Sequence, residues 1–585
     1  MGALRWIEDH PYGPKTPFWT RANAGEVLPM PPTPAAWDLT WANGGAVAGW
    51  RQCAVNRLGI GDDELHPDQD RCDFIGIIGG YAYLGATWIR VWAERTPGMT
   101  AADIDAAYFG DHPDVPAYEP EPWHENAQTT EVMTAWLGWV MGTMDQSELE
   151  EQRQEAHRIR AERPDLRSMG EAELLERARS LRPVCRDLFD MHINQSGAAS
   201  IGPGVIGAVC AAVGRPEAAM RVLAGLGGVD SAAPSFALWD LSRTVRNDPA
   251  LVALFDGGPD GLDARLRAAG APAASFVADV DGFLTEFGSR GPNEWDISAA
   301  TWETTPDLAL TLVDRMRFQD DGDDPRRAQQ AREAERASLT AEIAELVAAD
   351  PETHGQFLAA VASAGTFVPG RERSKTNIVR VIEEARLAIW EIGRRQVDAG
   401  VVAEPADVCL LFENELAALV AGRLEDPAGL IEQRRLHYER LLELEPPFII
   451  NGAAPPQDAW PRRRDHEVAV AADGDVLQGV PGCPGTYRGR ARIVLDPADP
   501  GALEPGDVLI APHTDPAWTP LFVPAGAVVV NVGAALSHAI IVSRELGIPC
   551  VVSATDATGR ITDGALVEVN GDAGTVTVVE AARQG

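Results

Sequence analysis

The residue best placed for chemistry is His538, which follows glycine, small residues and a serine in NVGAALSHAIIVSRELGIPCVV (residues 531–552). The pattern predicts a buried strand before it and a helix that begins there, with Ser537 as N-cap. First-turn N–H groups and the positive end of the helix dipole would stabilise an anion on this imidazole. The same field disfavours imidazolium and so keeps a nucleophilic nitrogen available. From spacing alone, a histidine that only fills a helix start remains the alternative.

Two cationic residues, Arg371 and Lys375, extend an apolar stripe on a predicted helix. The stripe continues at spacings of three and four residues through Ile378, Ile382, Ala385, Ile389 and Ile392. This spacing places all seven residues on one helix face. Burial of the two cationic residues is energetically unfavourable unless they face a cavity or an anion. Lys375 is one of only two lysines, the other being Lys15. The alternative is a helix that starts after Pro369 and Gly370, with residues 371–375 emerging into solvent.

The stretch around His538, together with APHTDPAWTPLF (511–522), resembles the mobile phosphohistidine domain of the phosphoenolpyruvate-utilising enzymes. TDPAWTP is particularly similar to the rifampicin phosphotransferase branch of that superfamily. The resemblance implies that His538 carries a phosphoryl group between distant sites as its domain swivels. It also nominates Asp515 and Trp518 as substrate-binding residues.

Three further segments resemble the substrate-binding region of that branch. RERSK (371–375) is similar to its R-E-x-x-K element, which implies a catalytic role for Arg371 and Lys375 in facing the phosphohistidine. Residues 18–37 and 283–307 resemble two other elements of the same region. They nominate a set of substrate-binding polar side chains: Asn23, Glu26, Arg290, Glu294 and Asp296. The alternative for the last three is a structural turn pinned by an arginine–carboxylate pair.

The order of these patterns predicts a multidomain α+β protein. Residues 1–445 are expected to form a large, mainly α-helical substrate-binding domain, and 446–478 a linker rich in Pro, Ala and charge. Residues 479–585 alternate short β-branched runs with one helix, which indicates a swivelling α/β domain of the phosphohistidine type. Two glycine-rich stretches carry no phosphate-loop signature: 75–85 is predicted to be strand and turn, and 225–235 a helix-connecting loop or an anion nest.

The composition limits the partners. A net charge of −37 should repel nucleic acid and anionic membranes. The seven cysteines have no metal-ligand spacing, so buried reduced thiols, a cytoplasmic location and no metal site are expected. Residues 1–11 are charged and lack the apolar core of a signal peptide.

The resemblance leaves the source of phosphate open. The substrate-domain similarity begins near Phe18, so we expect no ATP-grasp domain in this chain and no cofactor bound by the chain alone. The favoured hypothesis is a phosphotransferase that acts on a hydroxyl of a small, partly apolar metabolite, with ATP-derived phosphate supplied by a separate ATP-grasp protein. One alternative is a cofactor-independent dehydratase, hydratase or isomerase of secondary metabolism that uses His538 as general acid and base. The other is a non-catalytic ligand-binding protein.

Overall fold

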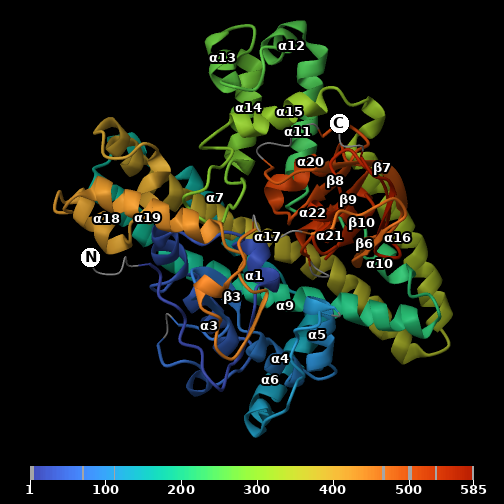
Figure 1. Ribbon diagram of the computed structural model, residues 1–585. Helices are drawn as coiled ribbons and strands as arrows, with labels where there is room; N and C mark the ends of the chain where they lie inside the picture. The colour runs from blue at the N-terminus through green and yellow to red at the C-terminus, as the bar shows by residue number, and fades with distance from the viewer. Residues whose placement is uncertain are drawn as a thin grey trace. The chain divides into compact units, whose positions relative to one another are not determined.

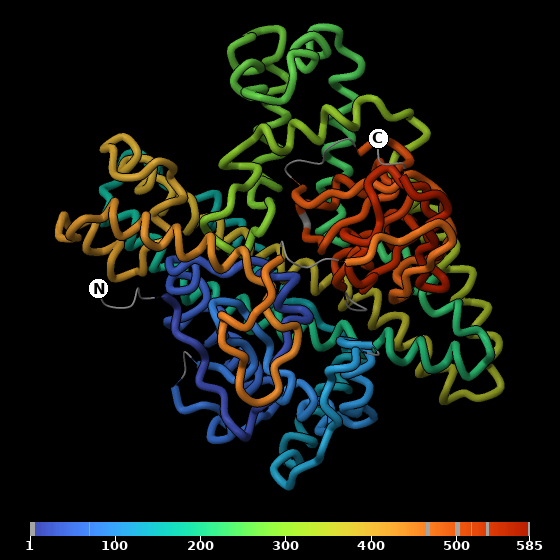
Figure 2. The backbone as a smooth tube through the Cα atoms, viewed as in Figure 1, coloured from blue at the N-terminus to red at the C-terminus, as the bar shows by residue number. Residues whose placement is uncertain are grey.

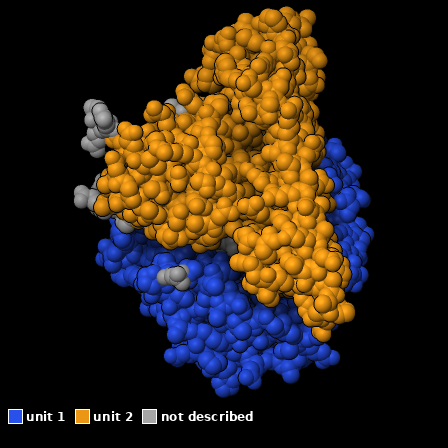
Figure 3. Space-filling view, turned by 90° about the vertical axis from the view of Figure 1, so that its right-hand side faces the viewer, with its two compact units in different colours: residues 1–198, 295–299, 374–467 blue, residues 199–294, 300–373, 468–585 orange. Residues whose placement is uncertain are grey.

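The computed structural model describes residues 6–68, 71–110, 112–463, 468–497, 503–533 and 537–582. The chain divides into two compact units, which are coloured in Figure 3. Unit 1 comprises residues 1–198, 295–299 and 374–467, and unit 2 comprises 199–294, 300–373 and 468–585. Each unit therefore combines distant segments of sequence. The path of the chain can be followed in Figure 2.

Unit 1 is mainly helical and contains one small antiparallel sheet in the order β2-β3-β1-β4. Its strands are β1 (Phe18–Thr20), β2 (Ile75–Ile78), β3 (Tyr81–Leu84) and β4 (Ile449–Asn451). Its α-helices are α1 (Ala22–Val27), α2 (Pro34–Ala36), α3 (Ala46–Asn56), α4 (Ala86–Glu94), α5 (Ala101–Phe109), α6 (Ala127–Gly138), α7 (Ser147–Ala161), α8 (Glu171–Ser180), α18 (Glu413–Val420) and α19 (Pro427–Leu442). The 75–85 stretch is thus a hairpin, as predicted. Strand β4 lies within the segment that was expected to be a linker.

Unit 2 joins a second set of helices to an eight-stranded sheet (Figure 1). The helices are α10 (Ala218–Val222), α11 (Ala233–Asn247), α12 (Pro249–Phe255), α13 (Leu262–Ala268), α14 (Ala274–Phe287), α15 (Asp307–Met316), α16 (Pro325–Val347), α20 (Thr519–Phe522), α21 (His538–Leu546) and α22 (Ala557–Arg560). The strands are β5 (Val476–Gln478), β6 (Val480–Cys483), β7 (Thr486–Ile493), β8 (Val508–Ala511), β9 (Ala527–Val530), β10 (Cys550–Val552), β11 (Leu566–Asn570) and β12 (Thr575–Glu580).

The order of this sheet is β5-β12-β11-β7-β8-β9-β10-β6. The sequences of four of its strands agree with their positions in the sheet. Strands β8 (VLIA) and β9 (AVVV) are buried along their whole length and pair in parallel. Strands β11 and β12 alternate buried and half-buried residues and pair antiparallel, as expected for strands with one exposed face. The predicted fold class, a large helical region with a C-terminal α/β region, is confirmed.

Two long helices, α9 (Arg182–Ala212) and α17 (Pro351–Asp398), contain residues of both units. The alternative in which a helix starts after Pro369 and Gly370 is wrong, because α17 spans 48 residues and Pro369 lies inside it. A proline removes one helical hydrogen bond, but packing can offset this loss. The side chains before it, Phe367 and Val368, are buried. The predicted stripe from Ile378 to Ile392 is buried in the core of unit 1.

Large aromatic side chains support both cores. Trp41 and Trp295 lie in the core of unit 1, with ring centroids 5.6 Å apart, and Trp302 lies in the core of unit 2. All seven cysteines are buried and free, as the composition predicted. Among the described residues, no helix is both long and apolar enough to cross a membrane.

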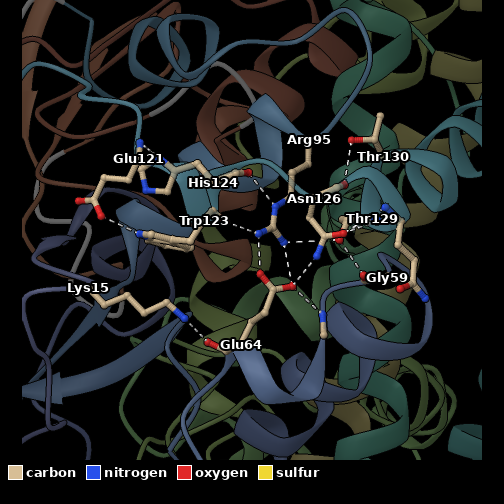
Figure 4. A network of polar contacts seen from close by, with 12 residues as sticks. Lys15, Gly59, Glu64, Arg95, Glu121, Trp123, His124, Asn126, Thr129 and Thr130 are labelled. Carbon is tan, nitrogen blue, oxygen red and sulfur yellow. Dashed lines mark hydrogen bonds and ion pairs between the residues drawn. The ribbon is translucent and has the colours of Figure 1, made fainter.

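Arg95 lies at the centre of a polar network in unit 1 (Figure 4). Its side chain is almost fully buried and forms an ion pair of 2.5 Å with Glu64. It also donates hydrogen bonds to the carbonyl oxygens of His124 (2.9 Å) and Trp123 (2.8 Å). Asn126 donates to the same carboxylate at 3.0 Å. One guanidinium thus connects α4, η2 (Asp62–Glu64), η3 (Pro122–His124) and the start of α6.

The electrostatics of this network favour an ionised Glu64. Burial alone would raise the pKa of Glu64, but Arg95 and the Gly61 N–H outweigh it and hold the pKa below its usual value. Lys15 adds a hydrogen bond of 2.7 Å to the backbone carbonyl of Glu64.

Arg95→Lys should destabilise the protein although it keeps the charge. An ammonium cannot reproduce the planar fork that reaches one carboxylate and two carbonyls, so we expect a loss of about 2 kcal/mol, measured by thermal unfolding. The matched control is Arg158→Lys. Arg158 is exposed on α7 and pairs with Glu155 at 2.6 Å, so its replacement should leave the melting temperature almost unchanged. Equal effects in the two variants would contradict the role given to Arg95.

Candidate functional site

His538 lies at the carboxyl edge of the parallel strands in unit 2. Strand β9 ends at Val530, the chain passes through residues 531–537, and α21 begins at His538 and leads back to β10. Ser537 occupies the N-cap position as predicted, but its hydroxyl caps no backbone N–H group. Residues 534–536 of the motif lie outside the described residues. The edge formed by the carboxyl ends of parallel strands is where open α/β sheets bind their ligands.

The imidazole of His538 is buried between two threonine hydroxyls. Its Nε2 lies 3.0 Å from Oγ1 of Thr519, and its Nδ1 lies 3.4 Å from Oγ1 of Thr514. Thr514 follows the neighbouring strand β8, and Thr519 begins α20. The ring of Phe522 meets the imidazole edge-on, with centroids 6.2 Å apart. The ring is thus held in one orientation, and its nearer polar contact is at Nε2.

The turn between these threonines contains Asp515 and Trp518, both nominated from the sequence. Oδ1 of Asp515 accepts a hydrogen bond of 2.9 Å from the Ala517 N–H, which shapes the turn. Oδ2 accepts one of 3.1 Å from the Asn293 N–H, which belongs to the 290–294 loop. Trp518 is buried in the core of unit 2. Asp515 therefore joins the turn beside His538 to a second loop of the same unit.

That second loop contains Arg290 and Glu294. Both side chains are buried and form an ion pair of 2.9 Å. Asn293 between them has a φ of 54°, a left-handed conformation that asparagine tolerates better than most residues. This is the arginine–carboxylate turn expected under the structural interpretation, while substrate contact by either residue stays a prediction.

The far end of α21 is anchored by Glu545, whose carboxylate is bound by a glycine-rich loop. Leu226 and Gly227 donate backbone N–H bonds of 2.8 and 3.0 Å to its two oxygens. Gln329 of α16 adds a bond of 3.3 Å. The glycines at 225, 227 and 228 all have positive φ angles, a conformation that makes an anion-binding nest from successive N–H groups. The 225–235 stretch, which connects α10 to α11, thus binds a carboxylate of the protein itself.

The carboxylate in this nest is costly to ionise. Glu545 is 1% exposed, and burial raises its pKa, although the N–H groups of Gly227 and Leu226 act in the opposite direction. Because the pKa of Glu545 is raised in the folded state, protonated Glu545 contributes to the free energy of unfolding fully at low pH. This contribution is lost as the pH rises through the pKa of the folded state.

Arg371 and Lys375 occupy one face of α17, one turn apart. Arg371 forms an ion pair of 2.5 Å with Glu372, whose side chain is almost fully buried. Lys375 is 9% exposed, so the alternative in which it emerges into solvent does not hold. By contact clustering, Arg371 belongs to unit 2 and Lys375 to unit 1.

The other nominated residues lie in unit 1. Asn23 and Glu26 are half-buried on α1. Asp296 accepts hydrogen bonds from the N–H (2.7 Å) and hydroxyl (2.8 Å) of Thr33, the N-cap of α2. The contacts of Asp296 are thus those of a structural clamp, and a substrate role for these three residues stays a prediction. In the part of the chain that the structure describes, no group of three or more His, Cys, Asp and Glu side chains is arranged to hold a metal ion.

Two segments of the chain match known families. Residues 191–372 match the rifampicin phosphotransferase fourth domain. Residues 503–574, which include His538 and both threonines, match the PEP-utilising enzyme mobile domain. These two segments are similar to the rifampicin phosphotransferases and to the PEP-utilising enzymes. The resemblance seen in the sequence around His538 is thereby confirmed.

Curated relatives agree with this assignment. A rifampicin phosphotransferase of Streptomyces sviceus is 31% identical over 59% of this chain and 39% of its own length. The prodigiosin synthesizing transferase PigC of Serratia marcescens is 32% identical over 61% of this chain and 40% of its own. An uncharacterised protein of Mycobacterium tuberculosis is 33% identical over 59% of this chain and 36% of its own. The chain thus spans well under half the length of these relatives.

Sequence reasoning missed three contributors to this region: Thr514, Thr519 and Glu545. The two threonines stand at the ends of the TDPAWT motif that had been singled out, so their hydroxyls could have been nominated from it. Glu545 follows His538 by seven residues, two helical turns, which places both on one face of α21. No sequence signal connects Glu545 with residues 226 and 227, because that contact spans more than 300 positions.

Glu545→Gln should change how stability depends on pH. Protonation of the wild-type carboxylate stabilises the folded state, whereas glutamine does not titrate, so the wild type should gain stability relative to the variant as the pH falls from 8 to 5. Melting temperatures measured across that range test this, with Glu580→Gln at the exposed end of β12 as control. A difference between wild type and Glu545→Gln that is constant with pH, or of opposite slope, would refute the assignment.

Proposed function

We propose that this chain is a phosphotransferase in which His538 accepts a phosphoryl group and passes it to a hydroxyl of a small, partly apolar metabolite. The observation that carries the proposal is the position of His538. It begins α21 at the carboxyl edge of the parallel strands, within the segment that matches the PEP-utilising mobile domain.

The first step forms a phosphorus–nitrogen bond. A neutral imidazole nitrogen attacks the donor phosphate, and the phosphorus–oxygen bond to the leaving nucleotide breaks. Nε2 is the nitrogen we assign to this role, because its contact with the Thr519 hydroxyl is the shorter one. The hydroxyl must rotate away as the phosphoryl group arrives, and it can then donate a hydrogen bond to a phosphoryl oxygen.

Local donors support an anion at this position. The Ser537 hydroxyl is buried and has no hydrogen-bond partner among the described residues, so it is available to a phosphoryl oxygen. The first-turn N–H groups of α21 and the helix dipole act in the same direction. These groups would stabilise the negative charge of phosphohistidine.

The second step transfers the phosphoryl group to the acceptor. The acceptor oxygen forms its bond to phosphorus as the phosphorus–nitrogen bond breaks, and the hydroxyl proton leaves to solvent or to a nearby base. Such a transition state spreads negative charge over the phosphoryl oxygens. We assign Arg371 and Lys375 of α17 to this charge, because a guanidinium fork and a point charge complement each other there.

The phosphate donor that we propose is ATP bound by an ATP-grasp protein that acts in trans. The support is the kinship with rifampicin phosphotransferases, together with the acidic surface of this chain, which by itself does not attract a nucleotide. The partner and the acceptor are tested together below.

His538→Asn should abolish phosphohistidine formation. The experiment incubates the full chain with ATP, with and without an ATP-grasp protein encoded nearby, and detects phosphohistidine by mass spectrometry. We expect label on His538 only with the partner, and its loss when rifampicin or a suitable small hydroxylated metabolite is added. His437→Asn serves as the control, because His437 lies in unit 1 beside Trp6 and its replacement should leave the labelling of His538 unchanged.

The opposite result defines the competing function. If no label forms with any donor, yet the chain converts a metabolite and His538→Asn abolishes that conversion, His538 acts as general acid and base and phosphotransfer is excluded. If neither label nor conversion occurs, a non-catalytic binding protein is the remaining explanation.

Lys375→Gln should distinguish the phosphorylation of His538 from the transfer of the phosphoryl group to the acceptor. Loss of the ammonium should leave phosphorylation of His538 unchanged but slow transfer to the acceptor by about 10²- to 10³-fold, since it removes charge stabilisation in the transition state. Single-turnover decay of phosphohistidine in the presence of acceptor measures this. Lys15→Gln is the matched control, because Lys15 is the only other lysine and contacts the Glu64 carbonyl instead. Equal transfer rates for the two variants would remove Lys375 from the mechanism.

A further inference from the structure

Unit 1 contains a pocket that none of the functions above uses. Its volume is about 260 Å³, and it lies between α6, α7 and α9. Two tryptophans and four polar side chains in its wall are used in the argument below: Trp136, Trp139, Asp145, Glu148, Asn194 and Gln195. Two tryptophans with a few convergent polar groups are the usual composition of a small-molecule site.

One wall of this pocket holds a buried amide with an unused acceptor. Gln195 is 1% exposed, and its Oε1 has no hydrogen-bond partner among the described residues. In the part of the chain that the structure describes, its Nε2 makes one long contact, of 3.6 Å, with the sulfur of Met191. Leaving a buried carbonyl oxygen unpaired is unfavourable, and a hydrogen-bond donor of a ligand would recover that free energy. The neighbouring Asn194, by contrast, accepts a bond of 2.8 Å from Trp136 Nε1, which fixes that indole.

The backbone beside the pocket is irregular in a way that presents Trp139. Residues Trp139–Thr143 form a π-helical turn directly after α6. The turn ends at Met144 in a left-handed conformation with a φ of 53°, which is uncommon for a residue other than glycine. Both features are costly in an ordinary helix and recur at functional sites.

The charges around the pocket select against anions. The guanidinium of Arg57 is occupied by two carboxylates, at 2.5 Å from Glu148 and 2.8 Å from Asp190. Hydrogen bonds from the N–H and hydroxyl of Ser147 hold the pKa of Asp145 below its usual value. Arg57 is thus already paired with two carboxylates, and Asp145 adds a further negative charge to the pocket wall, so the field in the pocket is negative.

We infer that this pocket binds a planar aromatic amine, with its ring against the two tryptophans. A ring N–H donates to Oε1 of Gln195, and a cationic amine lies toward Asp145 and Glu148. An aromatic face beside an indole and a cation beside carboxylates are both favourable. The site does not depend on phosphotransfer by His538.

Tryptamine is the probe for this site, because it combines an indole N–H with a cationic amine. Binding to the full-length chain at pH 7 is measured by isothermal titration and saturation-transfer NMR. We expect tryptamine to bind at least tenfold more tightly than indole-3-acetate, which has the same ring and the opposite charge. Asp145→Asn should narrow that difference. Equal binding of the two probes, or no binding of either at millimolar concentration, would overturn the proposal.

The hydrogen bond to Gln195 is tested with 1-methyltryptamine, which lacks the ring N–H. Methylation should weaken binding to the wild type by about fivefold, the value of one neutral hydrogen bond. In Gln195→Leu the two amines should bind alike. Gln356→Leu, at an exposed position on α17, should keep the full fivefold difference. If Gln195→Leu fails to fold, the comparison of the two amines on the wild type still decides, since equal affinities would exclude the bond.

Discussion

A buried carboxylate must be matched by donors wherever it lies, and in unit 2 this requirement fixes the helix that begins with His538. Glu545 meets two backbone N–H groups of the 225–228 loop at one end of α21, while the hydroxyls of Thr514 and Thr519 hold the imidazole at the other. The orientation of the histidine therefore depends on contacts at both ends of a nine-residue helix. The carrier role proposed for His538 needs such restraint, because phosphoryl transfer depends on alignment with donor and acceptor.

The excess of acid over base explains why backbone donors recur in this protein. With 87 acidic and 50 basic residues, many carboxylates cannot find a cation. Asp296 binds the N–H of Thr33, Asp515 binds that of Asn293, and Glu545 binds those of the glycine-rich loop. Buried Arg95 in turn serves several acceptors at once, one carboxylate and two backbone carbonyls. The buried polar groups of the cores thus find their hydrogen-bond partners largely without ion pairs to lysine.

The sequence predicted those features that depend on periodicity or local motifs. The apolar stripe of α17, the short strands of the C-terminal sheet and the helix start at His538 all follow from residue spacing. The continuation of α17 through Pro369 did not, because packing overrode the local preference of proline. The hydrogen bonds between Glu545 and the 225–228 loop could not be predicted either. Their donors are backbone N–H groups, which every residue type except proline has. Whether Asn23, Glu26 and Asp296 touch a substrate depends on the ligand rather than on the fold.

The 225–228 loop binds Glu545 through main-chain atoms, and this decides which substitutions in the loop are tolerated. Side-chain identity at Leu226 is free to drift, because its N–H would donate whatever the residue. Gly225 is different: an added Cβ would lie 2.6 Å from the Glu333 nitrogen, and its φ of 60° disfavours other residues. A saturation mutagenesis profile of residues 225–228 should therefore be uneven, intolerant at the three glycines with positive φ and permissive at Leu226. The attachment of α21 therefore constrains the backbone conformation of this loop and leaves the side chain at position 226 free to vary.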